Sequence, residues 1–164
     1  MNLTKKYTFL ILLFSLTSCH LINCDLDSDL EPLTAKPSVE SVKGTWYPDK
    51  RTMESVSVYR KSENPEFIIS SDGTFKMSRI PAKTFTLLPS KNPSEKSVDA
   101  TGTWKLVESR GFVFLALNID FKENTFGLSG LLYSFQIQTK NESMVLFENI
   151  GDPDECEAVR LIKK

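Results

Sequence analysis

Short apolar runs separated by turn residues make up the chain from residue 39 onward. In residues 133–138 aromatic and aliphatic side chains alternate with Ser and Gln, the two-residue period of a strand with one buried face. The pair Asp72-Gly73 separates two further runs, 67–70 and 74–78, and favours the tight turn of a hairpin. The pattern therefore predicts strands joined by short turns.

Two more hairpins and a closing strand continue this pattern. Their strands are predicted at 102–107 with 112–117, at 133–138 with 144–147, and at 158–162. Helical periodicity is weak beyond the first eighteen residues, so we expect at most short helices, at 49–55 and 125–130. The prolines of residues 80–99 interrupt the strands, either as an edge strand with a loop or as a flap over one end.

A meander of this length closes into a barrel or folds into a sandwich. Closure also removes the exposed strand edges at which sheets aggregate. We therefore predict an all-β domain over residues 39–164, in which an antiparallel meander closes into a small barrel, with a β-sandwich as the alternative.

The first eighteen residues follow another pattern. Lys5 and Lys6 precede an apolar run, 9–16, that is far shorter than the ~20 residues a membrane-spanning helix needs. The segment Leu16-Thr17-Ser18-Cys19 then resembles the lipobox of bacterial lipoprotein signal peptides. The resemblance implies that residues 1–18 are removed and that Cys19 is acylated. An ordinary secretory signal and a buried N-terminal helix are the alternatives.

Acylation would fix the location of the protein. Each buried methylene contributes about 0.8 kcal/mol, so the three acyl chains of such lipoproteins hold essentially permanently. His20 follows the cysteine, whereas in lipoproteins of enteric type an aspartate there favours the inner membrane. For a Gram-negative host the resemblance implies the outer membrane, facing the periplasm. Residues 19–38 are acidic and contain prolines, and we expect them to form the lipidated N-terminus and a flexible tether.

The net charge bears on which macromolecules could bind the protein, and the cysteines bear on whether it contains a disulfide. The mature chain would hold 18 basic against 21 acidic residues, a net charge of −3, without a basic cluster; this argues against nucleic acid. Cys24 and Cys156 are the remaining cysteines, and in an oxidising compartment they favour a disulfide worth up to ~5 kcal/mol. Unpaired thiols or a two-cysteine metal site are the alternatives.

The tripeptide Gly-Thr-Trp occurs twice, at 44–46 and at 102–104. At the head of a strand and followed by the Asp-Gly-Thr-Phe hairpin at 72–75, it looks like small bacterial lipocalin-like domains, over most of residues 40–164. The resemblance implies that Trp46 closes the floor of the barrel and that Trp104 packs on it or lines the wall. Both are candidate binding residues; packing in the core alone is the alternative.

Candidate chemistry is sparse. His20, the only histidine, lies beside the predicted lipid, so Ser-His and Cys-His catalysis is not expected. No spacing singles out a catalytic carboxylate pair, and we predict no enzyme activity, no cofactor and no metal site. Residues 151–157 hold four acidic side chains, which fit a turn better than a calcium loop. Asp152, Asp154 and Glu155 are candidate contacts to a basic partner.

These features favour a non-enzymatic binding lipoprotein of the periplasm. An immunity-type protein that neutralises a periplasmic toxin fits the size, the anchor and the acidic tip. A lipocalin-like carrier of a small apolar ligand, such as a fatty acid, is the alternative, and an envelope hydrolase that uses carboxylates is a third. Aromatic side chains that would line or fill the interior are Phe75, Phe112, Phe114, Tyr133, Phe135 and Phe147.

Overall fold

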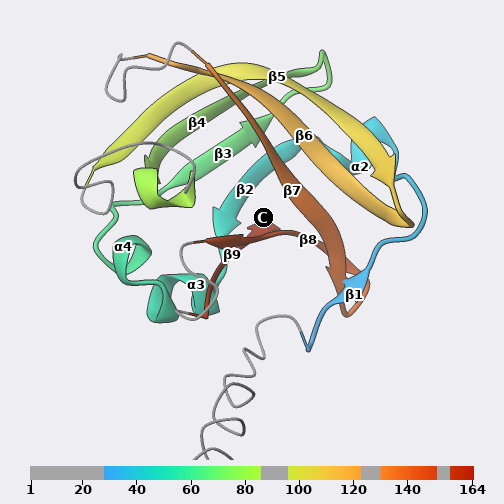
Figure 1. Cartoon of the computed structure of the whole chain (residues 1–164), viewed down its shortest axis with the longest axis horizontal. Coiled ribbons are helices and arrows are strands. Elements are labelled where there is room, and N and C mark those ends of the chain that lie inside the picture. Colours follow the sequence, from blue (N-terminus) through green and yellow to red (C-terminus); the bar gives the residue numbers. More distant parts are fainter. Residues whose placement is uncertain (1–27, 86–95, 123–129, 151–155) are drawn as a thin grey trace, which may run out of the picture.

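Eight antiparallel strands close into a barrel in the computed structural model of the chain (Figure 1). The structure describes residues 28–85, 96–122, 130–150 and 156–164. The barrel strands are β2 (Gly44–Pro48), β3 (Glu66–Ile69), β4 (Thr74–Pro81), β5 (Ser97–Ser109), β6 (Phe112–Phe121), β7 (Leu131–Lys140), β8 (Ser143–Ile150) and β9 (Glu157–Lys163). Each strand pairs with the next, and β9 pairs with β2 to close the ring. The predicted barrel is confirmed in preference to the sandwich.

A ninth strand and several short helices lie outside the ring. They are β1 (Glu31–Pro32), α2 (Val39–Val42), α3 (Lys50–Ser55), α4 (Ser57–Arg60) and a 3₁₀ helix (Ala82–Thr84). The helix expected over 49–55 is therefore confirmed, whereas most of the one expected over 125–130 lies outside the described residues. None of the helices in the described part of the chain is long and apolar enough to cross a bilayer.

Alternation along the strands separates the inside of the barrel from its outer surface. On β6, for example, Val113, Leu115 and Leu117 are buried, whereas the residues between them are exposed or half-buried. All eight barrel strands contribute side chains to one apolar core. Of the six aromatic residues predicted to line or fill the interior, Phe75, Tyr133 and Phe135 belong to this core or pack against it. The other three do not contribute to it: Phe112 and Phe114 lie on the outer side of β6, and Phe147 is buried in a separate apolar cluster outside the barrel core.

The two ends of the barrel are built differently (Figure 1). One end carries α2 and the tight turns of the β5–β6 and β7–β8 hairpins, and the other carries α3 and α4. At the α2 end the Nε1 of Trp46 donates to the Val42 carbonyl oxygen at 2.9 Å, and both residues are fully buried. The indole thus joins the helix to the first barrel strand.

The ladder between β7 and β8 is incomplete. It runs from Lys140 and Ser143 to Gln136 and Phe147, and no pairing continues beyond this point among the described residues. Residues 131–135 still pair with β6, and residues 148–150 still pair with β9. The barrel wall therefore lacks interstrand hydrogen bonds over a short stretch near the α3–α4 end.

Candidate functional site

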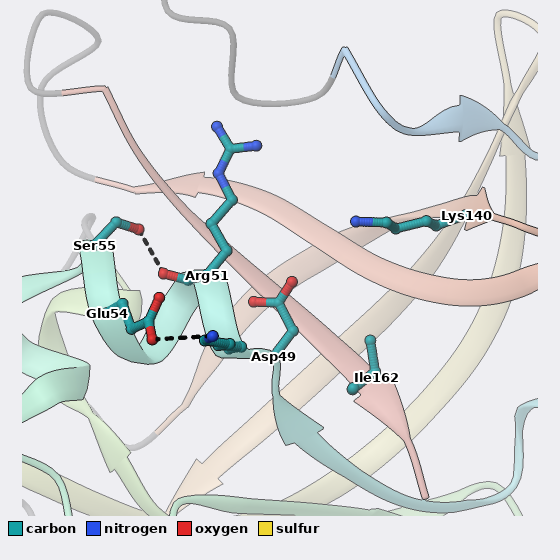
Figure 2. Close-up of a pocket in the computed structure, with 7 residues that line it drawn as sticks. Asp49, Arg51, Glu54, Ser55, Lys140 and Ile162 are labelled. Carbon is teal, nitrogen blue, oxygen red and sulfur yellow. Dashed lines mark hydrogen bonds and ion pairs between the residues drawn. The ribbon is translucent and has the colours of Figure 1, made fainter.

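A shallow groove of about 680 Å³ lies on the outside of the barrel, between α3 and the end of the β7–β8 hairpin (Figure 2). Arg51 and Asp49 approach it from the side of α3, and Lys140 extends toward them from the opposite side. The residues that line it are Asp49, Lys50, Arg51, Glu54, Ser55, Lys140 and Ile162. The groove thus presents both signs of charge around one apolar side chain.

Local capping explains why α3 begins where it does. The Asp49 carboxylate accepts a hydrogen bond from the backbone N–H of Thr52 at 2.7 Å and so satisfies one of the unpaired donors at the helix start. Lys50 and Glu54 lie one turn apart with 3.7 Å between their charged atoms. This exposed pair adds little energy, but it orders two charges at the rim of the groove.

The buried hydroxyl of Thr52 fastens α3 to β9. It accepts a hydrogen bond from the backbone N–H of Arg160 at 2.9 Å and donates to the Arg160 carbonyl oxygen at 3.2 Å. The backbone N–H of Asp49 also donates to that carbonyl oxygen, at 2.9 Å. The barrel wall therefore fixes the position of the groove's helical side.

Three cationic side chains converge on Asp29, next to the groove. Its Oδ1 lies 2.7 Å from Nη1 of Arg160 and 3.7 Å from Nη1 of Arg51, and its Oδ2 lies 2.5 Å from Nζ of Lys140. We call Arg51, Lys140 and Arg160 the cationic cluster. The hydrogen bond from Lys140, together with that from Arg160, lowers the pKa of Asp29 to about 2. The carboxylate is therefore ionised at any physiological pH.

Asp29 belongs to a segment, residues 29–33, that packs along the barrel and that we call the arm. Leu30 is buried in an outer apolar cluster with Val145, Phe147 and Ala158. The short strand β1 then pairs with residues 138–139 of β7. The pairing between β6 and β7 ends one residue earlier, at Ile137. The folded unit therefore begins by residue 29, ten residues before the boundary at 39 that the sequence predicted, and the arm is not a free tether.

A second polar group lies at the α3–α4 end. The hydroxyl of Tyr59 lies 2.8 Å from Oγ1 of Thr84, and the hydroxyl of Tyr133 donates to the Thr84 carbonyl oxygen at 2.8 Å. Alternation along β8 places Glu148 on the inner side, and burial raises the pKa of its carboxyl to about 7. The side chain of Glu148 makes no hydrogen bond or ion pair with the described residues. This group offers hydroxyl and carboxyl oxygens that can bind polar atoms.

Both predicted tryptophans lie in the barrel core. Trp46 lies beside α2, where its Nε1 donates to the Val42 carbonyl oxygen, and Trp104 donates from Nε1 to the Ser70 carbonyl oxygen at 2.9 Å. Each indole N–H is thus satisfied by a backbone carbonyl within the protein. A binding role for either residue stays a prediction.

Most other predicted site residues lie outside the described part of the chain. These are Cys19, Cys24, Asp152, Asp154 and Glu155. Cys156 is described and lies half-buried immediately before β9, with φ of 52°. Lipidation of Cys19, the disulfide between Cys24 and Cys156, and contacts of the acidic tip all stay predictions.

Sequence reasoning missed the cationic cluster and its partner Asp29. One signal was present, since Arg160 interrupts the apolar run of residues 158–162 and is only 2% exposed. A charged side chain within a buried strand requires a counter-charge or hydrogen bonds, but the sequence does not say from where. In the described residues no three His, Cys, Asp or Glu side chains are grouped so as to hold a metal ion.

Comparisons with known proteins identify no relative of this chain. Protein-family models, curated proteins and solved structures were each compared with the chain, and none of them matches it.

Proposed function

We propose that the protein is a membrane-anchored periplasmic lipoprotein whose barrel is a non-enzymatic binding module. The observation that carries the proposal is the charged groove on the outside of a barrel whose interior holds one apolar core. Exposed side chains of both signs that are held by a rigid scaffold suit recognition of a polar macromolecular surface. The lipobox-like segment Leu16–Cys19 supports the anchor.

Within this class we propose an immunity-type protein that neutralises a toxin delivered to the periplasm. Lys50 and Glu54, at the groove rim, have side chains that are 86% and 66% exposed and are therefore accessible to a protein partner. The acidic residues Asp152, Asp154 and Glu155 would extend the contact surface. Charged rims of this kind steer association and select partners more than they add affinity.

The partner is tested by deletion and by recovery of complexes from the envelope. A strain that lacks the protein should become sensitive to a toxin encoded beside its gene, and the toxin should co-purify with the tagged protein. Lys50→Glu should weaken that recovery, whereas Lys76→Glu, at an exposed position on β4 away from the groove, should leave it unchanged. Unchanged sensitivity after deletion would exclude the immunity role.

The anchor is tested separately from the partner. Metabolic labelling with palmitate should mark the full-length protein and should fail to mark Cys19→Ala, which should no longer fractionate with membranes. Cys24→Ala is the matched control, because it removes a nearby cysteine without altering the lipobox-like segment. Equal labelling of the wild type and Cys19→Ala would contradict lipid attachment at this residue.

The second candidate, a carrier of a small apolar ligand, has one observation in its favour. Glu148 faces the inside of the barrel next to the gap in the β7–β8 ladder, together with the tyrosines that bind Thr84. An apolar interior with a few convergent polar groups is typical of small-molecule sites. Native mass spectrometry of the purified protein should then show a bound ligand; a ligand-free protein that also fails to take up fluorescent fatty acids would exclude this role.

A further inference from the structure

We propose that the cationic cluster is an anion-binding site that the protein fills with its own Asp29, and that a phosphate group can replace Asp29 and release the arm. The cluster has the composition of a phosphate or carboxylate receptor. Arg160 offers a nearly fully buried guanidinium, and Arg51 and Lys140 approach the two carboxylate oxygens from other elements. Guanidinium and ammonium groups that converge on one anion are the usual means of binding phosphate.

The barrel, rather than the arm, carries the backbones of the three cationic residues. Arg160 lies within β9, and Arg51 lies on α3, which the Thr52 hydroxyl binds to β9. Lys140 ends β7 and pairs with Ser143 across the hairpin turn. The cluster should therefore keep its geometry when the Asp29 carboxylate is absent, which is the condition for binding an external anion.

An external anion has access to the cluster. The side chains of Arg51 and Lys140 are 42% and 46% exposed, and that of Asp29 is 36% exposed. The same two cations line the open groove of about 680 Å³, which leaves room for a phosphate group (Figure 2). Replacement of Asp29 thus requires no opening of the barrel.

A small set of contacts besides Asp29 holds the arm. Leu30 packs in the outer apolar cluster, half-buried Leu33 packs against the barrel core, and the Thr139 hydroxyl donates to the Glu31 carbonyl oxygen at 3.3 Å. Strand β1 has two residues, one of which is Pro32. Proline has no N–H to give to the ladder, and the hydrogen bond from the Leu33 N–H to the Ile137 carbonyl oxygen is 3.3 Å long. Segments with so few buried contacts and backbone bonds open before the rest of a domain does. An anion that takes the place of Asp29 therefore shifts the arm toward its released state.

Thermal unfolding of the full mature chain in phosphate, at constant ionic strength against chloride, tests the site. Inorganic phosphate should raise the Tm of Asp29→Ala by about 3–6 °C at ten times its Kd. Glu31→Ala, which removes an exposed charge from the same arm, should keep the smaller response of the wild type. The double variant Asp29→Ala/Lys140→Ala should lose the phosphate response, and Asp29→Ala/Lys50→Ala should retain it. Equal Tm values of Asp29→Ala in phosphate and chloride, or a response that survives Lys140→Ala, would overturn the proposal.

Hydrogen exchange distinguishes the sources of phosphate. The amides of Leu30, Glu31 and Leu33 in the wild type should exchange faster in phosphate than in chloride; unchanged exchange would overturn release of the arm. A further increase with phosphatidylglycerol vesicles, but not with phosphatidylcholine vesicles, identifies an anionic headgroup as the ligand, and an effect of free phosphate alone identifies the free anion. The Tm response needs no acyl chain, so failure of palmitate labelling would remove the anchor and leave the anion site standing.

Discussion

Gly102 of β5 lies directly against the Asn118 carbonyl of β6. A Cβ atom on Gly102 would lie 2.0 Å from the Asn118 oxygen and 3.0 Å from Cε1 of Phe75. The sequence predicted that both Gly-Thr-Trp tripeptides begin a strand. The second copy, at 102–104, instead lies inside β5, which begins at Ser97. Its glycine is required there because the backbone of the next strand approaches closely.

Substitution of Gly102 should therefore disturb the barrel. We expect Gly102→Ala to lower the free energy of unfolding by about 1–3 kcal/mol, because the methyl group collides with backbone rather than with a side chain that can rotate. Thr101→Ser, at an exposed position next to Gly102 on the same strand, is the control. Denaturant unfolding of both variants measures the difference, and equal stabilities would contradict the close approach.

Thr52→Val should destabilise the attachment of α3 to the barrel. The substitution keeps the side-chain shape but removes the hydroxyl that bonds both the N–H and the carbonyl oxygen of Arg160. Buried backbone groups left without that partner should lower the free energy of unfolding by roughly 1–3 kcal/mol. Ser55→Ala removes an exposed hydroxyl from the same helix and should change stability by less than about 0.5 kcal/mol. A Thr52→Val protein as stable as Ser55→Ala would show that these bonds contribute little.

Glu148 should make stability depend on pH near neutrality. The folded protein keeps this proton up to a pKa of about 7, whereas the unfolded chain releases it near 4.5. The native state thus binds more protons between these values, so the contribution of Glu148 is full below pH 4.5 and is lost as pH rises to 7.

Comparison with an amide isolates this effect. The stability of Glu148→Gln should not decline with pH in this way. Its free energy of unfolding relative to that of the wild type should therefore rise by about 1–2 kcal/mol between pH 4.5 and 8. This value is reduced because the Glu148 side chain is partly exposed to solvent. Glu108→Gln, at an exposed position on β5, should run parallel to the wild type. Parallel curves for Glu148→Gln as well would place the carboxyl in ordinary contact with solvent.

The cysteine pair should behave as a disulfide. If Cys24 and Cys156 are bonded and Cys19 is acylated on sulfur, the denatured, unreduced mature protein should expose no titratable thiol. Because the bond would close a loop over most of the domain, its removal by Cys156→Ala should cost about 2–5 kcal/mol. Reaction of two thiols per chain before reduction would rule the bond out.

The strands were predictable because their signals are local. The turn at Asp72-Gly73 and the alternation of residues 133–138 predict β3–β4 and β7, and both appear near the expected positions. Their ends were less certain: β5 and β6 extend beyond the predicted 102–107 and 112–117, because pairing continues where the hydrophobic pattern is weak. The four-residue helices α2 and α4 are too short to show a helical period.

The site could not be predicted in the same way, because its parts meet only in the folded chain. Asp29, Arg51 and Lys140 read in sequence as three unrelated surface charges, and their meeting with Arg160 depends on closure of the barrel. The inward position of Glu148 follows from the register of β8, which the hairpin turn at 141–142 determines.

The interrupted pairing between β7 and β8 leaves a weak line in the barrel wall. Along residues 131–135 and 148–150 the two strands can part without breaking any interstrand hydrogen bond between these residues. Local opening of the barrel wall should therefore begin between these two stretches. A molecule that enters the interior would pass here, between Tyr133 and Glu148, rather than beside α2, where the Trp46 indole binds the Val42 carbonyl oxygen.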